Sequence, residues 1–109
     1  PEGIAASLVA GSGPDAFIVN RGEQASAAAL ALARDLRGNG LVVDLDDSGS
    51  AFGKQFKRAD RRGARWALVL GDDEAERGEL RLKPLQQSGE ERCIRLDDRE
   101  ALLAILKSP

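Results

Sequence analysis

Residues 41–71 of the chain, LVVDLDDSGSAFGKQFKRADRRGARWALVLG, hold two short apolar runs on either side of an amphipathic segment. The two runs, at 41–45 and 66–70, are typical of strands that are buried on both faces of a sheet. Between them, residues 51–62 show helical periodicity, with Ser50 as the expected N-cap. Two strands joined by a helix predict a parallel pair, because parallel strands need a crossover connection.

The same alternation of strands and helices extends in both directions along the chain. Further elements are expected as a strand at 16–19, a helix at 23–37, two strands at 79–83 and 92–96 that can pair as a hairpin, and a last helix. The last helix is expected to bury Ala101, Leu102, Ile105 and Leu106 and to be capped by Asp97 and Glu100. Right-handed crossovers that put the first two helices on opposite faces place the first strand between the second and the third.

The composition indicates one domain without catalytic machinery. The chain has 109 residues, 42% of them hydrophobic; residues 14–109 are predicted to form the domain and residues 1–13 a linker or a leftover of an expression vector. The absence of histidine and the single cysteine exclude an intrachain disulfide, a zinc site and a histidine-containing triad. Cys93 and Trp66 are both expected to be buried. The longest apolar run, 27–33, is too short to cross a membrane, and we expect a cytoplasmic protein.

Positive charge is concentrated in one segment, although the net charge of the chain is −2. Residues 54–65 include six lysines and arginines and one aspartate, a local balance of about +5. One side of the predicted helix carries Phe52, Phe56 and Ala59, and the other side carries Lys54, Lys57, Arg58 and Arg61. A stripe of one sign without carboxylates four residues away is typical of phosphate binding, and a solvated surface is the alternative.

The predicted strand order also locates a binding crevice. In such sheets ligands bind at the carboxyl ends of the strands where the winding reverses, which places the crevice at the loops 20–22 and 71–74. The carboxylates of the second loop, Gly71-Asp72-Asp73-Glu74, can accept hydrogen bonds from base amines or hold a hard cation. The alternative for this loop is a polar turn that caps a short helix at 74–77.

A long spaced motif joins these segments. The chain has SAFGKQFKRAD at 50–60, GA at 63–64, WALVLG at 66–71, then Glu74, and GELRLKPL at 78–85. Over about residues 15–106 this pattern closely resembles the C-terminal anticodon-binding domain of histidyl-tRNA synthetases, a group of class IIa aminoacyl-tRNA synthetases. The related domains of the threonine, proline and glycine enzymes share the fold and only part of the motif.

The resemblance implies a three-layer α/β/α fold, with a mixed, mostly parallel five-stranded sheet and three helices, that binds the anticodon stem-loop of tRNA(His). The candidate base contacts, taken from the motif and from the loop after the first strand, are Glu74, Lys83 and Arg21. The candidate phosphate contacts, taken from the motif and from the cationic side of the helix, are Lys54, Lys57, Arg58 and Arg61.

The resemblance further implies a parent enzyme, expected to be a homodimer, whose catalytic domain uses ATP and Mg²⁺ to attach histidine to tRNA(His). That domain is absent from this chain, and no catalytic residue, metal or cofactor is expected in the segment itself. The chain departs from the family pattern at Arg58, where an aromatic residue is usual, so a stacking surface is lost unless the guanidinium plane replaces it. The alternative function is a pseudo-anticodon module that serves protein interaction or dimerisation without binding RNA.

Overall fold

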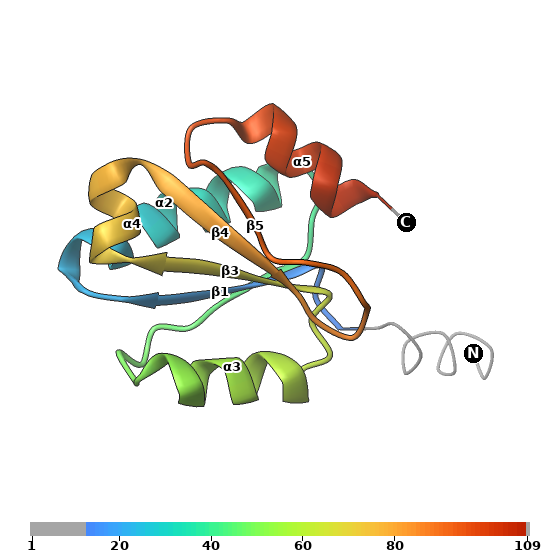
Figure 1. Ribbon diagram of the computed structural model, residues 1–109, viewed down its shortest axis with the longest axis horizontal. Coiled ribbons are helices and arrows are strands. Elements are labelled where there is room, and N and C mark those ends of the chain that lie inside the picture. The colour runs from blue at the N-terminus through green and yellow to red at the C-terminus, as the bar shows by residue number, and fades with distance from the viewer. Residues whose placement is uncertain (1–12, 109) are drawn as a thin grey trace.

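The apolar runs form a central sheet with helices on both of its faces (Figure 1). A computed structural model describes residues 13–108 of the chain. Its elements are β1 (Ala16–Arg21), α2 (Glu23–Gly38), β2 (Val43–Leu45), α3 (Phe52–Arg61), β3 (Trp66–Gly71), α4 (Asp72–Arg77), β4 (Glu79–Pro84), β5 (Arg92–Arg95) and α5 (Arg99–Lys107).

The sheet has the strand order β2-β1-β3-β4-β5, so β1 lies between β2 and β3 as predicted. β1 pairs in parallel with both of these neighbours, because α2 and α3 supply the two crossovers. β4 is antiparallel to β3, and β5 is antiparallel to β4. The predicted mixed five-stranded sheet is therefore confirmed, with β2 and β5 at its two edges.

Two apolar cores hold the three layers together. α2 and α5 cover one face of the sheet and α3 covers the other (Figure 1). The larger core joins Ala29, Leu32 and Leu36 of α2 and Leu102 and Leu106 of α5 to buried residues of β1, β3 and β4. The smaller core packs the inner side of α3 against Phe17, Val19 and Val69, with Phe52 and Phe56 half-buried at its edge. α3 thus reaches β1 and β3 and leaves the same face of β4 and β5 open.

The helix starts differ from those predicted. Ala51, not Ser50, is the N-cap of α3, because the Ser50 hydroxyl contacts Ser48 and Arg58 instead of the helix backbone. Asp98, not Asp97, caps α5: its side chain accepts a hydrogen bond from the Ala101 N–H at 3.1 Å.

Other differences concern element lengths and number. Residues 72–77 form a fourth helix, α4, where three helices were predicted, and β2 covers 43–45 where a strand at 41–45 was predicted. The predicted linker falls on residues outside the described part of the chain, except for Gly13.

The two residues expected to be buried behave differently. Trp66 is buried at the start of β3, as predicted, whereas the prediction for Cys93 was wrong. Cys93 is exposed because it lies on an edge strand, opposite Arg81, on the part of the α3-side face that α3 leaves open. Within residues 13–108, no helix has the length and apolar character needed to cross a membrane.

Candidate functional site

A hollow of about 390 Å³ opens where β1 and β3 end, beside the start of α3. It lies at the sheet edge that the strand order predicted as the binding crevice. Its lining residues, drawn from β1, α3, β3, α4 and β4, are Arg21, Phe52, Phe56, Val69, Gly71, Asp72, Asp73, Glu74 and Arg81.

Aromatic side chains form one wall of this hollow. Phe52 and Phe56 are four residues apart on α3, so their rings lie on the same side of the helix, facing the sheet. The Lys83 ammonium lies 4.9 Å from the centre of the Phe56 ring, within the range of a cation–π contact. Phe56 therefore lines the hollow and also contacts the Lys83 ammonium.

The predicted base contact Glu74 is engaged within the protein. Its Oε1 accepts a hydrogen bond from the Gly71 N–H at 2.8 Å, which caps the start of α4. Its Oε2 lies 3.7 Å from Arg77 and 3.8 Å from Arg81. Since only 12% of this side chain is exposed, Glu74 mainly shapes the corner between β3 and α4. A Cβ at position 71 would lie 2.7 Å from its Oε1, so the Glu74 carboxylate would have to move to admit a side chain there.

Two arginines stand on opposite sides of the hollow. Arg81 donates a hydrogen bond to Glu91 at 2.9 Å, and this bond raises the pKa of Arg81 above its usual value. Arg21 ends β1, is exposed, and has no hydrogen-bond or ion-pair partner within residues 13–108. Arg21 is therefore available to a ligand, and Arg81 is held in place.

A buried glutamine that the sequence analysis did not identify fixes α3 beside the hollow. Gln55 is fully buried; its Oε1 accepts from the Asn20 N–H at 2.8 Å, and its Nε2 donates to the Asn20 carbonyl at 2.8 Å. The same Nε2 donates to the Ser50 carbonyl at 2.7 Å. The available signal was a polar residue on the apolar side of an amphipathic helix, where a buried amide needs partners.

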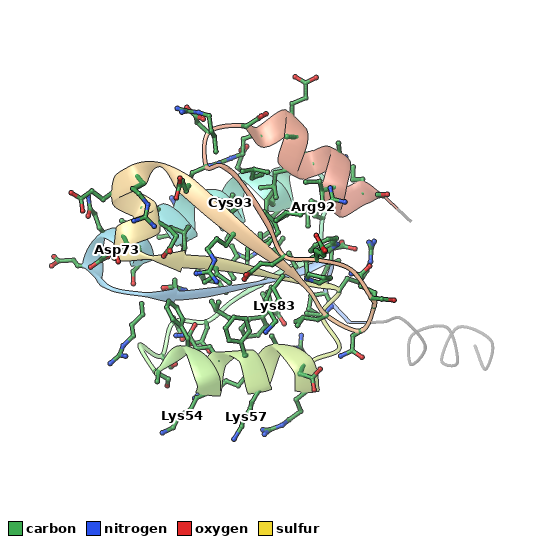
Figure 2. The ribbon with its side chains drawn as sticks, in the orientation of Figure 1. Lys54, Lys57, Asp73, Lys83, Arg92 and Cys93 are labelled. Atoms are coloured by element: carbon green, nitrogen blue, oxygen red, sulfur yellow. The ribbon has the colours of Figure 1, made fainter. Side chains whose placement is uncertain are left out.

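The structure does not bring Lys54 and Lys57 to the hollow. Both side chains leave α3 on the side away from the sheet, whereas Lys83 lies on the sheet side of the helix (Figure 2). Lys54, Lys57 and Arg61 are exposed and have no ion-pair partner in the described range 13–108. They form a separate cationic surface, which we call the outer face of α3.

Arg58, in contrast, has partners within residues 13–108. Its guanidinium donates to Asp46 Oδ2 at 2.8 Å, to the Ser48 hydroxyl at 2.8 Å and to the Ser50 hydroxyl at 3.2 Å. The stripe was expected to lack carboxylates four residues away on the helix, and the partner of Arg58 comes instead from the loop after β2. Arg58 thus stabilises that loop, and three partners fix the position of its guanidinium.

The surroundings of Asp46 favour the charged form of its carboxyl group, which pairs with Arg58. Burial alone would raise the pKa of its carboxyl group, but hydrogen bonds from Ser48 and Arg58 outweigh burial and lower the pKa. Arg62 is paired in the same way with Asp44 at 2.7 Å, and this hydrogen bond raises the pKa of Arg62. Arg58 of the predicted stripe and its neighbour Arg62 therefore join α3 to β2 and the loop after it.

The acidic loop is not arranged as a cation site. Among residues 13–108, no group of three or more acidic, cysteine or histidine side chains is placed to hold a metal ion. Asp72 instead accepts a hydrogen bond from the Ala25 N–H at 2.9 Å, at the start of α2.

Known proteins share this sequence and fold. The chain is 63% identical over 109 residues, all of its length, to the histidine–tRNA ligase of Parasynechococcus marenigrum (strain WH8102), of which it covers 25%. The structure matches that of apo S. aureus histidyl-tRNA synthetase with a TM-score of 0.75 and 32% identity, over 98% of this chain and 28% of that one. It also matches the histidyl-tRNA synthetase from Nostoc sp. PCC 7120 with a TM-score of 0.75 and 28% identity, over 95% of this chain and 27% of that one.

This topology, with a crevice at the ends of β1 and β3, defines the chain as an α/β domain of the kind found in aminoacyl-tRNA synthetases. A family model described as an anticodon binding domain matches residues 15–105. The chain therefore belongs to the anticodon-binding domain family, which confirms the resemblance of its motif. It spans about a quarter of the length of the relatives that it matches.

Proposed function

We propose that the chain is the anticodon-binding domain of a histidine–tRNA ligase and that it binds the anticodon stem-loop of tRNA(His). The observation that carries the proposal is the hollow at the ends of β1 and β3, in a chain whose whole length matches proteins of that name. In this proposal the domain selects the tRNA and takes no part in the chemistry of aminoacylation.

The hollow suits an unstacked base of a single-stranded loop. Proteins recognise such bases by stacking them on aromatic rings and bonding their edges. Phe52 and Phe56 supply ring surfaces, Arg21 supplies a donor in the lining, and Lys83 supplies one beside the Phe56 ring. Of the three predicted base contacts, Arg21 and Glu74 line the hollow directly, and Lys83 reaches it through the Phe56 ring.

The outer face of α3 suits the phosphate backbone. Lys54 and Lys57 point away from the sheet (Figure 2). Both lysines and Arg61 are exposed, and no carboxylate within residues 13–108 forms an ion pair with them and competes with phosphate. Because the hollow opens at the start of α3, a hairpin whose loop enters it can place backbone along this helix. We leave Arg58 out of the phosphate contacts, since Asp46 and two serines hold it.

We extend the proposal to the parent enzyme, taking its activity from the names of its relatives and its cofactors, location and dimeric state from the family that the motif resembles. Its catalytic domain, outside this chain, attaches histidine to tRNA(His) with ATP and Mg²⁺, and the enzyme works in the cytoplasm as a homodimer.

The test is a titration of the chain against labelled hairpins, followed by fluorescence anisotropy over a series of salt concentrations. A hairpin with the GUG anticodon should bind more tightly than the same stem with a scrambled loop. The double variant K54A/K57A should weaken binding to both hairpins and reduce the salt slope by about one unit for each phosphate that is no longer neutralised.

The matched control is R34A/K107A, which removes the same charge from exposed residues of α2 and α5. It should leave the salt slope close to that of the wild type. Equal, weak binding of the two hairpins, unchanged in K54A/K57A, would contradict the proposal and favour the interaction module instead.

A further inference from the structure

The three consecutive acids at the start of α4 differ in how much of each carboxylate is available. Asp72 accepts a hydrogen bond from the Ala25 N–H at 2.9 Å, and Glu74 accepts one from the Gly71 N–H at 2.8 Å. Asp73 is exposed, lines the hollow, and has no hydrogen-bond or ion-pair partner within residues 13–108. Figure 2 shows it at the corner where β3 meets α4. Asp73 is therefore the acid whose two oxygens are both available to a ligand.

The charge of this corner restricts which part of an RNA can approach it. Arg77 and Arg81 lie near the Glu74 carboxylate, but Asp73 has no ion-pair partner within residues 13–108, so its charge repels a phosphate group and the backbone is expected to keep away from it. A base edge that carries hydrogen-bond donors is attracted instead. Guanine, adenine and cytosine carry an exocyclic amine that can donate to a carboxylate, whereas uracil has none.

The rest of the hollow complements such a base. The rings of Phe52 and Phe56 offer a stacking surface beside Asp73, and Arg21 is a donor without a partner in the described range 13–108. A guanidinium can pair with the carbonyl and ring-nitrogen acceptors of guanine, and a carboxylate can accept from its amine. Acceptor, donor and aromatic wall thus surround one hollow of about 390 Å³.

We propose that Asp73 is a specificity-determining residue, whose carboxylate accepts a hydrogen bond from the exocyclic amine of a base held in this hollow. The proposal rests on the RNA-binding function proposed above. It assigns to Glu74, which the sequence motif had suggested as the base contact, the role of a positioning residue that holds Gly71 and Arg81.

The experiment compares hairpins in which each guanosine of the GUG anticodon is replaced in turn by inosine, which lacks only the exocyclic amine. The wild-type chain should lose about tenfold to a hundredfold in affinity for one of the two inosine hairpins, the range for one hydrogen bond to a charged group. In D73A the guanosine and inosine hairpins should bind equally, because the acceptor for the amine is gone.

The control is E76A, which removes the same charge from an exposed residue of α4 that does not line the hollow. It should keep the wild-type ratio of guanosine to inosine affinities. Because the readout is this ratio, a general change in affinity caused by the lower charge does not affect it. Thermal melts followed by the fluorescence of Trp66, the single tryptophan of the chain, check that each variant folds.

The outcomes separate the two proposals. If D73A keeps the wild-type discrimination, or if the wild type binds every inosine hairpin as well as the original, the role of Asp73 is wrong while RNA binding stands. If the wild type does not distinguish the GUG hairpin from the scrambled one, the proposed function fails, and the role of Asp73 fails with it.

Discussion

The side-chain amide of Gln55 bonds both the backbone N–H and the backbone C=O of Asn20, each at 2.8 Å. A helix and the end of a strand are thereby joined through one fully buried side chain. The contact matters for the hollow because Asn20 directly precedes Arg21, and Gln55 lies next to Phe56. The positions of a donor and of a ring at the hollow both depend on this amide.

Replacement of Gln55 by alanine should therefore destabilise the protein. It leaves buried backbone groups of Asn20 without partners, and we expect the free energy of unfolding to fall by about 2–4 kcal/mol, since each unsatisfied buried group costs about 1–3 kcal/mol. Urea unfolding followed by Trp66 fluorescence measures this. Q24A, an exposed glutamine of α2, is the control and should change the stability little. A Q55A variant as stable as Q24A would show that these hydrogen bonds contribute little.

Gly22, between β1 and α2, should not tolerate a side chain. Its φ is 115° and its ψ 155°, a conformation that is essentially restricted to glycine. A Cβ there would also lie 2.3 Å from the carboxylate of Asp72, which bonds the Ala25 N–H. We expect G22A to lose about 1–3 kcal/mol of stability, the usual cost of such strain.

Gly53 provides the opposite case for the same substitution. It lies in α3, and a Cβ there would meet no heavy atom within 4 Å. G53A should raise the free energy of unfolding by about 0.5 kcal/mol, because glycine is a poor helix former. Equal effects of G22A and G53A in the same urea titration would contradict the conformational explanation.

Phe56 is expected to contribute to RNA binding through its ring. F56L keeps an apolar side chain beside Val69 but removes the aromatic surface, so affinity for the GUG hairpin should fall by about 1–3 kcal/mol, the value of one stacked base. Anisotropy titration measures the loss, and urea unfolding reports how far folding is affected. F56Y, which keeps the ring, should bind nearly as the wild type does. If F56L and F56Y bind alike, stacking on this ring is excluded.

The free energy of unfolding should depend on pH through the carboxyl group of Asp46. Its pKa in the folded protein lies below the ordinary value of 3.8, so it contributes stability that is fully present above that pH. This contribution is lost as the pH falls through the lower folded-state pKa. Urea unfolding at a series of pH values should show that D46N is less stable than the wild type at neutral pH and that the two converge in acid.

The control for this pH dependence is Asp97. Its pKa is also lowered, by a hydrogen bond from Arg95, but both side chains of that pair are 74% exposed. D97N should therefore follow the wild-type curve closely, since exposed ion pairs contribute little. A D46N curve parallel to that of the wild type at every pH would rule out the paired carboxylate as the cause.

Much of the fold could be predicted because it depends on local patterns. The apolar runs at 16–19 and 66–70 became β1 and β3, and the order of strands and crossovers was enough to place β1 between its two neighbours. The amphipathic pattern of 51–62 also showed which side of α3 faces the sheet. A short apolar run cannot show whether its strand lies in the middle or at the edge of a sheet, which is why Cys93 was expected in the core.

The sequence predicted which loop and which helix form the site, but not which of their side chains have partners within the protein. The sequence by itself determined that an acidic corner and a cationic helix belong to one domain, since charge and spacing are properties of the chain, and its motif showed the resemblance to anticodon-binding domains. Only the tertiary structure decided which side chains have partners: Asp46 binds Arg58, and Glu74 accepts a hydrogen bond from Gly71. It also decided which do not: Asp73 has no partner within residues 13–108, and Lys54 points away from the sheet side of α3 (Figure 2). The partner of a side chain depends on distances between segments far apart in the chain, and those distances exist only after the layers have packed.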